Sequence, residues 1–440
     1  MITFVRIKLS PLVTWSTNTE DRAIIRRLKD GARWSLIGEA GSRALSFIAA
    51  AVVARLLGIA EFGGYALIQG SLAMFMTFAA FGIGQTTGRY VAALKNIEPS
   101  RIPALSSLGL LFSTISGAVA VIALWMLAPS IASVILNAPE LSAPLQLAAP
   151  GLFFSSVAGA LNGTIAGFES FGRLAKQGWA ASVVTFVAVI VGVSVAGLSG
   201  AAVGLVAGEA VRMALAAQGA SSVLKSRELP LLSGTGLSEA KVLWTFSLPT
   251  VISGALHVPI FWCCQAIIAG GPNGLAQVGL YDAAQKWMTL VIFVPTAASA
   301  IVAPVLSSLS VDYASHRATT LRVAAAQTAA CAIPAVLVAL LAPLAIGIFG
   351  TQFTAGASTL IVMMALGPIS MAIRLAWSSL LSLERAWMSC MLWLLWAALA
   401  LGLTWLWQGG GAYGLAWAML VAYSTTLCAY GVVLRKVWSS

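Results

Sequence analysis

The stretch SLIGEAGSRALSFIAAAVVARLLG, from Ser35 to Gly58, decides the fold of this chain. It is long and apolar enough to cross a bilayer as one helix, which takes about 20 mostly apolar residues. Yet it contains Glu39 and Arg43, although a charge at the bilayer centre costs roughly 2.5–3.5 kcal/mol on insertion scales. These two charges are four residues apart and therefore share one face of a helix. We expect a membrane helix with one hydrated face.

The composition of the whole chain is that of an integral membrane protein. Of its 440 residues, 59% are hydrophobic and 9% are charged, and the mean hydropathy is +0.93. A soluble domain has roughly 45–50% apolar and 25% charged residues, so the charges here are too few to cover a surface that faces water. Membrane topology explains the net charge of +11 better than nucleic-acid binding does, and we expect no nucleic acid as a partner.

Twelve segments of the chain are apolar over the length that a spanning helix requires. We expect helices at about residues 33–57, 62–86, 104–127, 142–166, 174–196, 200–222, 242–268, 277–303, 320–343, 357–381, 386–407 and 411–434. The fourth and sixth segments carry a small residue at every fourth position, which lets helices approach closely in lipid. These residues are Gly151, Ser155, Gly159, Gly163 and Gly167, and then Gly200, Gly204 and Gly208.

The distribution of Lys and Arg predicts the orientation of the helices, because cytoplasmic loops are enriched in these residues. With the N-terminus inside, 20 of the 25 basic residues lie in the termini and inner loops, and one, Arg55, lies at an outer helix end. The remaining four, Arg43, Arg212, Lys286 and Arg374, lie within the expected helices. We therefore expect a multi-pass protein with both termini in the cytoplasm.

An internal repeat relates two halves of the chain at an offset of 216 residues. GIAEFGGYALIQG, which begins at Gly58, aligns with GLAQVGLYDAAQK, which begins at Gly274. Each copy joins the first two helices of a six-helix block, and both blocks start inside, so the repeats are parallel. The expected fold is all-α, with twelve transmembrane helices in two parallel pseudo-repeats of six. Its expected parts are a cytoplasmic arm (1–32), a first lobe (33–222), a cytoplasmic linker (223–241) and a second lobe (242–435).

Acid–base pairs three or four residues apart recur inside the expected helices, at Glu39–Arg43, Glu209–Arg212 and Asp282–Lys286. Arg43 and Lys286 lie about 12–15 Å into their helices, at 1.5 Å per residue, which is too deep for their side chains to reach the headgroups easily. Such residues usually face a water-filled cavity, although neutralisation within the bundle is an alternative for each pair. For Glu209–Arg212, nearer the cytoplasmic side, we expect only neutralisation.

Three cations are the expected substrate-binding residues. Arg43, Lys286 and Arg374 would make a central cavity cationic and suited to an anionic substrate. Arg374 has no acid within one helical turn, and its alternative role is to extend toward the cytoplasmic headgroups. Phosphate suits arginine, because the guanidinium donates two parallel charge-assisted hydrogen bonds.

The sequence lacks the patterns of metal-dependent and nucleotide-driven chemistry. Its five cysteines lie in apolar segments without metal-ligand spacing, and its two histidines, His257 and His316, are far apart. No G-x-x-x-x-G-K-[ST] stretch occurs, so ATP is not the expected direct driver. We expect no metal, no cofactor and no catalytic residues.

A family resemblance rests on the two six-helix lobes and on two short stretches of sequence. These stretches are LLGIAEFGGYAL, which begins at Leu56, and FGIGQTTGRYVA, which begins at Phe81. The chain resembles the polysaccharide transport family, the O-antigen and exopolysaccharide repeat-unit flippases of the multidrug/oligosaccharidyl-lipid/polysaccharide exporter superfamily. The resemblance covers nearly the whole chain, from Arg33 to Arg435, and outside the two stretches it is largely one of hydropathy. Members of this family diverge strongly, so no binding residue carries over by motif.

The resemblance implies a V-shaped pair of lobes that flips undecaprenyl-diphosphate-linked oligosaccharide across the bacterial inner membrane by alternating access. It implies as partners this lipid-linked substrate, membrane lipids, and the polymerase and chain-length regulator of the same pathway. A cation-coupled multidrug or other lipid exporter of the same superfamily is the alternative, but a drug cation favours embedded acids over surplus bases. Oligosaccharide polymerases and ligases usually carry a long outer loop with catalytic Arg or His. The expected outer loops of this chain are short, so we expect that this protein is not an enzyme.

Glu39 and Asp282 are the expected ion-coupling residues. An arriving diphosphate competes with Glu39 for Arg43 and places negative charge nearby, which favours the uptake of a proton by Glu39. Loading and protonation would then be coupled by linkage. Asp282, beside Lys286, is the equivalent residue in the second lobe.

Overall fold

The computed structural model describes residues 19–80, 82–230, 234, 257–309 and 312–439, and every regular element in these ranges is helical. The first lobe consists of α1 (Thr19–Ala79), α2 (Ile83–Leu94), α3 (Ile102–Ser130), α4 (Ser142–Ala148), α5 (Pro150–Gly167) and α6 (Phe171–Lys225). The second lobe consists of α9 (His257–Ala269), α10 (Gly274–Val291), α11 (Phe293–Ser308), α12 (Tyr313–Leu340), α13 (Ala342–Gly347), α14 (Ala357–Ser382), α15 (Ala386–Leu406) and α16 (Gly411–Ser439). Short turns of 3-10 or π-helix lie at Pro99–Arg101, Ile131–Ile135, Pro139–Leu141, Thr351–Gly356 and Gln408–Gly410.

These helices agree with the predicted segments once their breaks are considered. α1 contains the first segment and most of the second, which continues into α2, and α6 contains the fifth and sixth. The fourth and eighth segments are each divided in two, as α4–α5 and α10–α11. Within the described residues, eight stretches are long and apolar enough to cross a membrane. The chain is therefore a multi-pass membrane protein.

Local sequence signals explain several of these boundaries. The first two segments meet at Gly58, whose φ of +80° is a conformation that glycine adopts without strain. Asp312 begins α12, where its Oδ1 accepts hydrogen bonds from the backbone N–H groups of Ala314 and Ser315 at 3.1 Å. Pro150 opens α5, where a missing N–H costs nothing.

Two predicted parts lie partly outside the described residues. Of the arm predicted at 1–32, residues 19–32 form the first turns of α1, so the first helix begins earlier than expected. Residues 1–18 lie outside the description, as do most of 231–256, which contain the end of the predicted linker and the start of the seventh segment. The boundaries of the four parts therefore stay a prediction.

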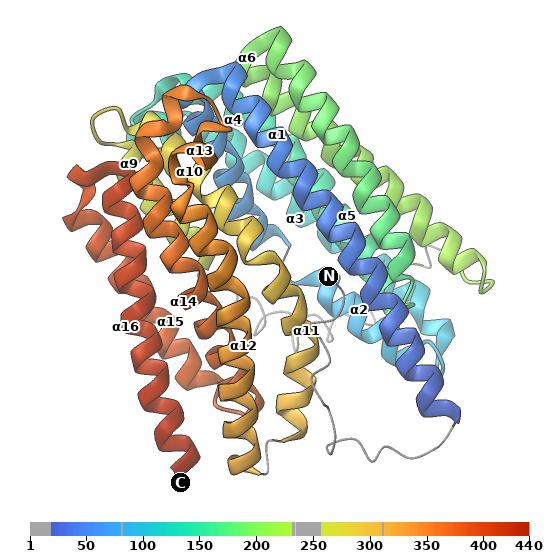
Figure 1. The fold of residues 1–440 in the computed structure, drawn as a ribbon. Helices are drawn as coiled ribbons and strands as arrows, with labels where there is room; N and C mark the ends of the chain where they lie inside the picture. Colours follow the sequence, from blue (N-terminus) through green and yellow to red (C-terminus); the bar gives the residue numbers. More distant parts are fainter. Residues whose placement is uncertain (1–18, 81, 231–233, 235–256, 310–311, 440) are drawn as a thin grey trace.

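Figure 1 shows the two lobes as the arms of a V. They lie side by side in the upper half of the view and diverge toward its lower end, where α1 begins and α16 ends. The predicted arrangement of two six-helix lobes is confirmed. The helices of the two lobes are therefore close together at one end of the molecule and farther apart at the other.

The two copies of the repeat form the joint between the lobes. Gly63 of α1 lies against the backbone carbonyl of Leu275 in α10, and Gly279 of α10 lies against the carbonyl of Ile59 in α1. A methyl group at either glycine would overlap the carbonyl that faces it. Since both pairs are related by the 216-residue offset, each lobe holds the other through equivalent positions, which is strong support for the duplication.

Aromatic side chains pack beside this joint. Phe62 of α1 contacts Phe349 and Phe353 of the second lobe, with ring centroids 6.1 and 5.7 Å apart. All three side chains are fully buried. Phe47 of α1 packs edge-on against Trp287 of α10 at 4.9 Å. This apolar packing seals the joined end of the V.

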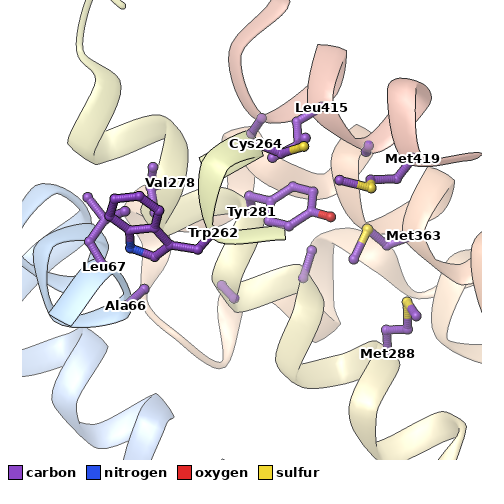
Figure 2. Packing of buried hydrophobic residues seen from close by; sticks show 14 of the residues in the cluster. Ala66, Leu67, Trp262, Cys264, Val278, Tyr281, Met288, Met363, Leu415 and Met419 are labelled. Carbon is purple, nitrogen blue, oxygen red and sulfur yellow. The ribbon is translucent and has the colours of Figure 1, made fainter. Parts of the chain in front are cut away.

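Two hydrogen bonds cross between the lobes in the same region. The Nε of Arg55 donates to the backbone carbonyl of Ile348 at 2.8 Å. The indole Nε1 of Trp262 donates to the Ser71 hydroxyl at 3.0 Å, and Figure 2 shows this indole lying against Leu67 of α1. Both bonds therefore join the two lobes directly.

The small-residue pattern of the fourth and sixth segments has the predicted role in packing. A methyl group on Gly84 of α2 would lie 2.6 Å from the carbonyl oxygen of Gly159 in α5, and Gly163 lies against Gly84 in turn. Gly200 and Gly192 meet in the same way across the two arms of α6. These glycines let the helix backbones touch.

The joint between the lobes can be tested with Gly63→Ala. The added methyl group would overlap the Leu275 carbonyl, which cannot move without shifting α10. Overpacking of this kind costs about 1–3 kcal/mol. We expect a lower melting temperature of the purified protein in detergent.

Gly402→Ala is the matched control, because Gly402 lies within α15 with nothing within 4 Å of the added methyl group. It should leave the melting temperature unchanged or raise it slightly. Equal melting temperatures for the two variants would contradict the proposed importance of the joint.

Candidate functional site

A cavity of about 170 Å³ lies between the lobes, bounded by α1 and α6 on one side and α10 on the other. Its described wall carries three cations, Arg43, Arg212 and Lys286, and no carboxylate. The other polar side chains of the wall are Ser46, Tyr65, Gln69, Ser182, Thr185 and Thr289. Such a wall favours an anionic ligand.

Arg43 is held from both lobes. Its Nη2 and Nε both donate to Oε1 of Glu39, one helical turn earlier, at 2.7 and 3.1 Å. Its guanidinium carbon also lies 5.2 Å from the ring centroid of Phe293 in α11, in cation–π contact. The guanidinium therefore has a fixed position near the boundary between the lobes.

Lys286 connects the lobes through a short polar chain. Its Nζ lies 3.2 Å from Oδ2 of Asp282 on the same helix and donates to Oε1 of Gln69 in the first lobe at 3.4 Å. The Gln69 amide donates in turn to the Tyr65 hydroxyl at 3.1 Å. Asp282 is only 7% exposed, so its charge is balanced mainly by Lys286.

Arg212 has a different position from the one we expected. Its Nε lies 3.2 Å from Oε2 of Glu209, so the pair is formed as predicted. However, Arg212 also lines the cavity together with Arg43 and Lys286. Arg212 therefore both pairs with Glu209 and faces this cavity.

The two carboxylates predicted to couple ions lie behind the cations. Glu39 faces a separate hollow of about 240 Å³ between α1 and α6, and its side chain is 48% exposed. Asp282 is buried within the second lobe. Each acid balances its base without entering the wall of the inter-lobe cavity.

Arg374 does not lie with the other two predicted binding residues. It lines a second cavity, of about 380 Å³, that is bounded by α9, α10, α14, α15 and α16 inside the second lobe. The two cavities share no lining residue. α10 separates them, because Lys286 faces the first cavity and its neighbour Gln285 faces the second.

Sequence reasoning assigned no role to most of the polar residues around Lys286 or to the aromatic walls of the second cavity. The repeat alignment contains one useful signal, since it pairs Tyr65 and Gln69 with Tyr281 and Gln285. The first pair lines the inter-lobe cavity and the second pair lines the cavity inside the second lobe. Both cavities are thus marked by the same duplicated element.

No metal ligands can be assigned in the part of the chain that the structure describes, because no three His, Cys, Asp or Glu side chains lie close enough to share an ion. The cationic inter-lobe cavity and the aromatic cavity of the second lobe are the two hollows that contain the predicted binding residues.

Solved structures of membrane transporters share this fold. The lipid II flippase MurJ, in an inward closed conformation, matches 91% of this chain and 87% of its own with a TM-score of 0.70 and 13% identity. The inward-facing conformation of a multidrug resistance MATE family transporter of the MOP superfamily matches 90% and 94% of the two chains, with a TM-score of 0.68 and 14% identity. At these identities the comparison shows the fold alone, the two-lobe helical transporter fold.

Two curated relatives are similar in sequence. The EPS I polysaccharide export inner membrane protein EpsE of Ralstonia solanacearum is 23% identical over 271 residues. The protein of the same name from Ralstonia nicotianae is similar to the same extent. The matched part spans 60% of this chain and 60% of each relative.

A family model described as polysaccharide biosynthesis protein matches residues 52–358. This match covers well over half of the chain and contains the joint between the lobes, Lys286 and both copies of the repeat. It agrees with the resemblance to polysaccharide flippases that the sequence indicated. The chain belongs to the polysaccharide biosynthesis protein family.

Proposed function

We propose that this protein is a flippase for the bacterial inner membrane. It moves undecaprenyl-diphosphate-linked oligosaccharide from the inner to the outer leaflet by alternating access, for the export of exopolysaccharide or O-antigen. Family membership and the transporter fold support export across a membrane. The name of the EpsE relatives supports polysaccharide export at the inner membrane.

The cationic cavity between the lobes is the observation that carries the proposal. Three cations converge there from α1, α6 and α10, so the cavity suits a diphosphate better than a neutral sugar. Its volume of about 170 Å³ suits a charged head group rather than a whole oligosaccharide. The rest of the substrate would extend into the space where the lobes diverge (Figure 1).

The distribution of basic residues supports an inward-facing state. The lobes diverge at the end where α1 begins and α16 ends. We propose that this end is cytoplasmic, because the inner loops and termini hold nearly all the Lys and Arg. The joined end, with Arg55, then faces outward, and the substrate enters from the cytoplasmic leaflet. A polymerase and a chain-length regulator are the proposed partners on the outer side.

A cation-coupled multidrug exporter is the second candidate. Embedded carboxylates favour it, since a drug cation needs an acid in its path. However, Glu39, Glu209 and Asp282 each lie within 3.2 Å of a base on the same helix. None of the three lines the inter-lobe cavity, which favours an anionic substrate.

Deletion of the gene should trap lipid-linked repeat units in the cytoplasmic leaflet while their synthesis continues. Trapped oligosaccharide stays protected from a glycosidase added outside spheroplasts, because the sugar cannot cross the bilayer unaided. Complementation with the wild-type gene should restore cleavage. If the units reach the outer leaflet normally but fail to polymerise, the protein acts as a polymerase and the flippase proposal is wrong.

Replacement of Arg43, Arg212 or Lys286 by Ala should slow flipping, since each loses a charge-assisted contact to diphosphate worth about 1.5–3 kcal/mol. Arg43→Lys should recover part of the rate, because an ammonium lacks the two-pronged donor geometry of a guanidinium. The rate is measured with a fluorescent lipid diphosphate in proteoliposomes.

Arg101→Ala is the matched control for these cavity variants. Arg101 pairs with Glu98 on the exposed loop before α3, at 2.8 Å, and its loss should leave flipping unchanged. Normal rates for all three cavity variants, at wild-type protein levels, would remove the cavity from the mechanism.

Glu39→Gln should abolish the response of flipping to a pH difference while substrate binding persists. The amide oxygen can still accept both Arg43 hydrogen bonds, but the amide cannot take up the proton that diphosphate loading favours. Flipping is compared in proteoliposomes with and without an imposed pH difference. Glu209→Gln is the control and should keep the response. A full response in Glu39→Gln would show that Glu39 is only the counter-ion of Arg43.

A further inference from the structure

One of the two histidines of the chain is buried where three helices of the second lobe meet. His316 lies near the start of α12, is completely buried, and lines neither of the two cavities described above. Its ring contacts Ser382, the last residue of α14, and Trp438 near the end of α16. Figure 1 shows the start of α12 and the end of α16 at the end of the molecule where the lobes diverge. His316 therefore ties the last turn of α16 to two other helices.

The hydrogen bonds of the His316 ring fix the position of its proton. The indole Nε1 of Trp438 donates to His316 Nδ1 at 3.1 Å. Because an indole nitrogen can only donate, Nδ1 accepts, and the neutral ring carries its proton on Nε2. Nε2 lies 2.8 Å from the Ser382 hydroxyl oxygen, and that hydroxyl donates its own hydrogen to the Ser379 carbonyl at 2.8 Å. The neutral ring is thus fully hydrogen-bonded, as donor and as acceptor.

The contact between Ser382 and His316 does not create a catalytic nucleophile. A serine is activated by an imidazole nitrogen that can take up the hydroxyl proton, whereas the Nε2 that faces Ser382 already carries one. The His316 side chain is also completely buried. A structural role for the contact is therefore favoured over a hydrolytic one.

Protonation of His316 conflicts with its bond to Trp438. A second proton can bind only to Nδ1, since Nε2 already carries the first. Both ring nitrogens of the imidazolium are donors, so the new N–H would point at the indole N–H from a distance of 3.1 Å. Two donors cannot form a hydrogen bond. Proton uptake and the Trp438 contact therefore exclude each other, and each weakens the other by linkage.

No nearby carboxylate compensates for a charge on His316. The charged residues close to the contact along α12, α14 and α16 are all exposed, and among the described residues none forms an ion pair with His316. They are Asp312 and Arg317 at the start of α12, Glu384 and Arg385 directly after α14, and Arg435 and Lys436 of α16. The Asp312 carboxylate accepts two backbone N–H groups instead. An imidazolium near a helix N-terminus is also disfavoured by the helix dipole, so the charged ring needs the contact to open to water.

We propose that His316 and Trp438 form a pH-sensitive latch at the divergent end of the second lobe. While His316 is neutral, it holds Trp438, and with it the end of α16, on α12 and α14. When His316 takes up a proton, it releases them. In the orientation proposed above this end is cytoplasmic, and histidine titrates in the physiological range, so acidification of the cytoplasm opens the latch. The latch is separate from the coupling proposed for Glu39, because it uses no residue of the inter-lobe cavity.

The first test is solid-state NMR of the full chain in liposomes, with isotopically labelled histidine. The chain has only two histidines, and the variant His257→Gln leaves the signals of His316 alone. At alkaline pH we expect a proton on Nε2 and none on Nδ1. Trp438→Phe, which keeps an aromatic ring but has no donor, should raise the proton affinity of His316 by about threefold to tenfold, the range of one lost hydrogen bond. A neutral ring protonated on Nδ1, or an unchanged proton affinity in Trp438→Phe, would overturn the proposal.

The second test is hydrogen–deuterium exchange of the last turn of α16, with rates corrected for the intrinsic effect of pH. In the wild type, exchange should become about threefold to tenfold faster between alkaline and acidic pH. His316→Gln should stay protected throughout, because the glutamine amide can accept from the indole and donate to Ser382 but does not titrate. Trp438→Phe should exchange fast throughout, and it keeps the test decisive if His316→Gln does not fold.

His257→Gln is the matched control for the exchange experiment. His257 also contacts α16, through the Tyr423 hydroxyl at 2.9 Å, but this contact lies several turns before the latch. The variant should keep the wild-type response at the end of α16. A wild type without a response, or an equal response in His316→Gln, would contradict the latch. Neither experiment measures transport, so both are independent of the flippase proposal.

Discussion

The approach of Gly63 and Gly279 to the carbonyl groups of the opposite lobe is the contact on which the rest of the molecule depends. Because no side chain separates the backbones there, α1 and α10 can touch, and the two lobes diverge away from that point (Figure 1). The divergence leaves room between the lobes for the cavity that Arg43 and Lys286 line.

The charges in this space are arranged so that most bases have an acid beside them while the wall of the inter-lobe cavity stays cationic. Glu39 and Asp282 neutralise the bases of their own helices, which lowers the cost of insertion. They do so from behind, so the wall itself stays cationic. Arg374 is the exception, because no acid of its own helix lies near it, and its surroundings are aromatic rather than polar.

Hydropathy and the 216-residue repeat were sufficient to predict twelve helices in two lobes, because both signals are local or periodic. The repeat even contains the glycines of the joint. The site was harder to predict. The spacing of residues along one helix shows which side chains share a face, and it therefore paired Glu209 with Arg212. It does not show which other helix packs against that face. Spacing alone therefore did not show that Arg212 lines the same cavity as Arg43 and Lys286, or that Arg374 lines a different one.

The hydrogen bond from Arg55 to the Ile348 carbonyl has a further consequence for the closed end. Its acceptor is an uncharged backbone group, whereas Arg43 and Arg101 pair with the carboxylates of Glu39 and Glu98. Dissolved ions screen an exposed pair of opposite charges strongly, but they weaken a bond to a neutral acceptor much less. The strength of this bond between the lobes therefore depends little on the ionic strength of the surrounding solution.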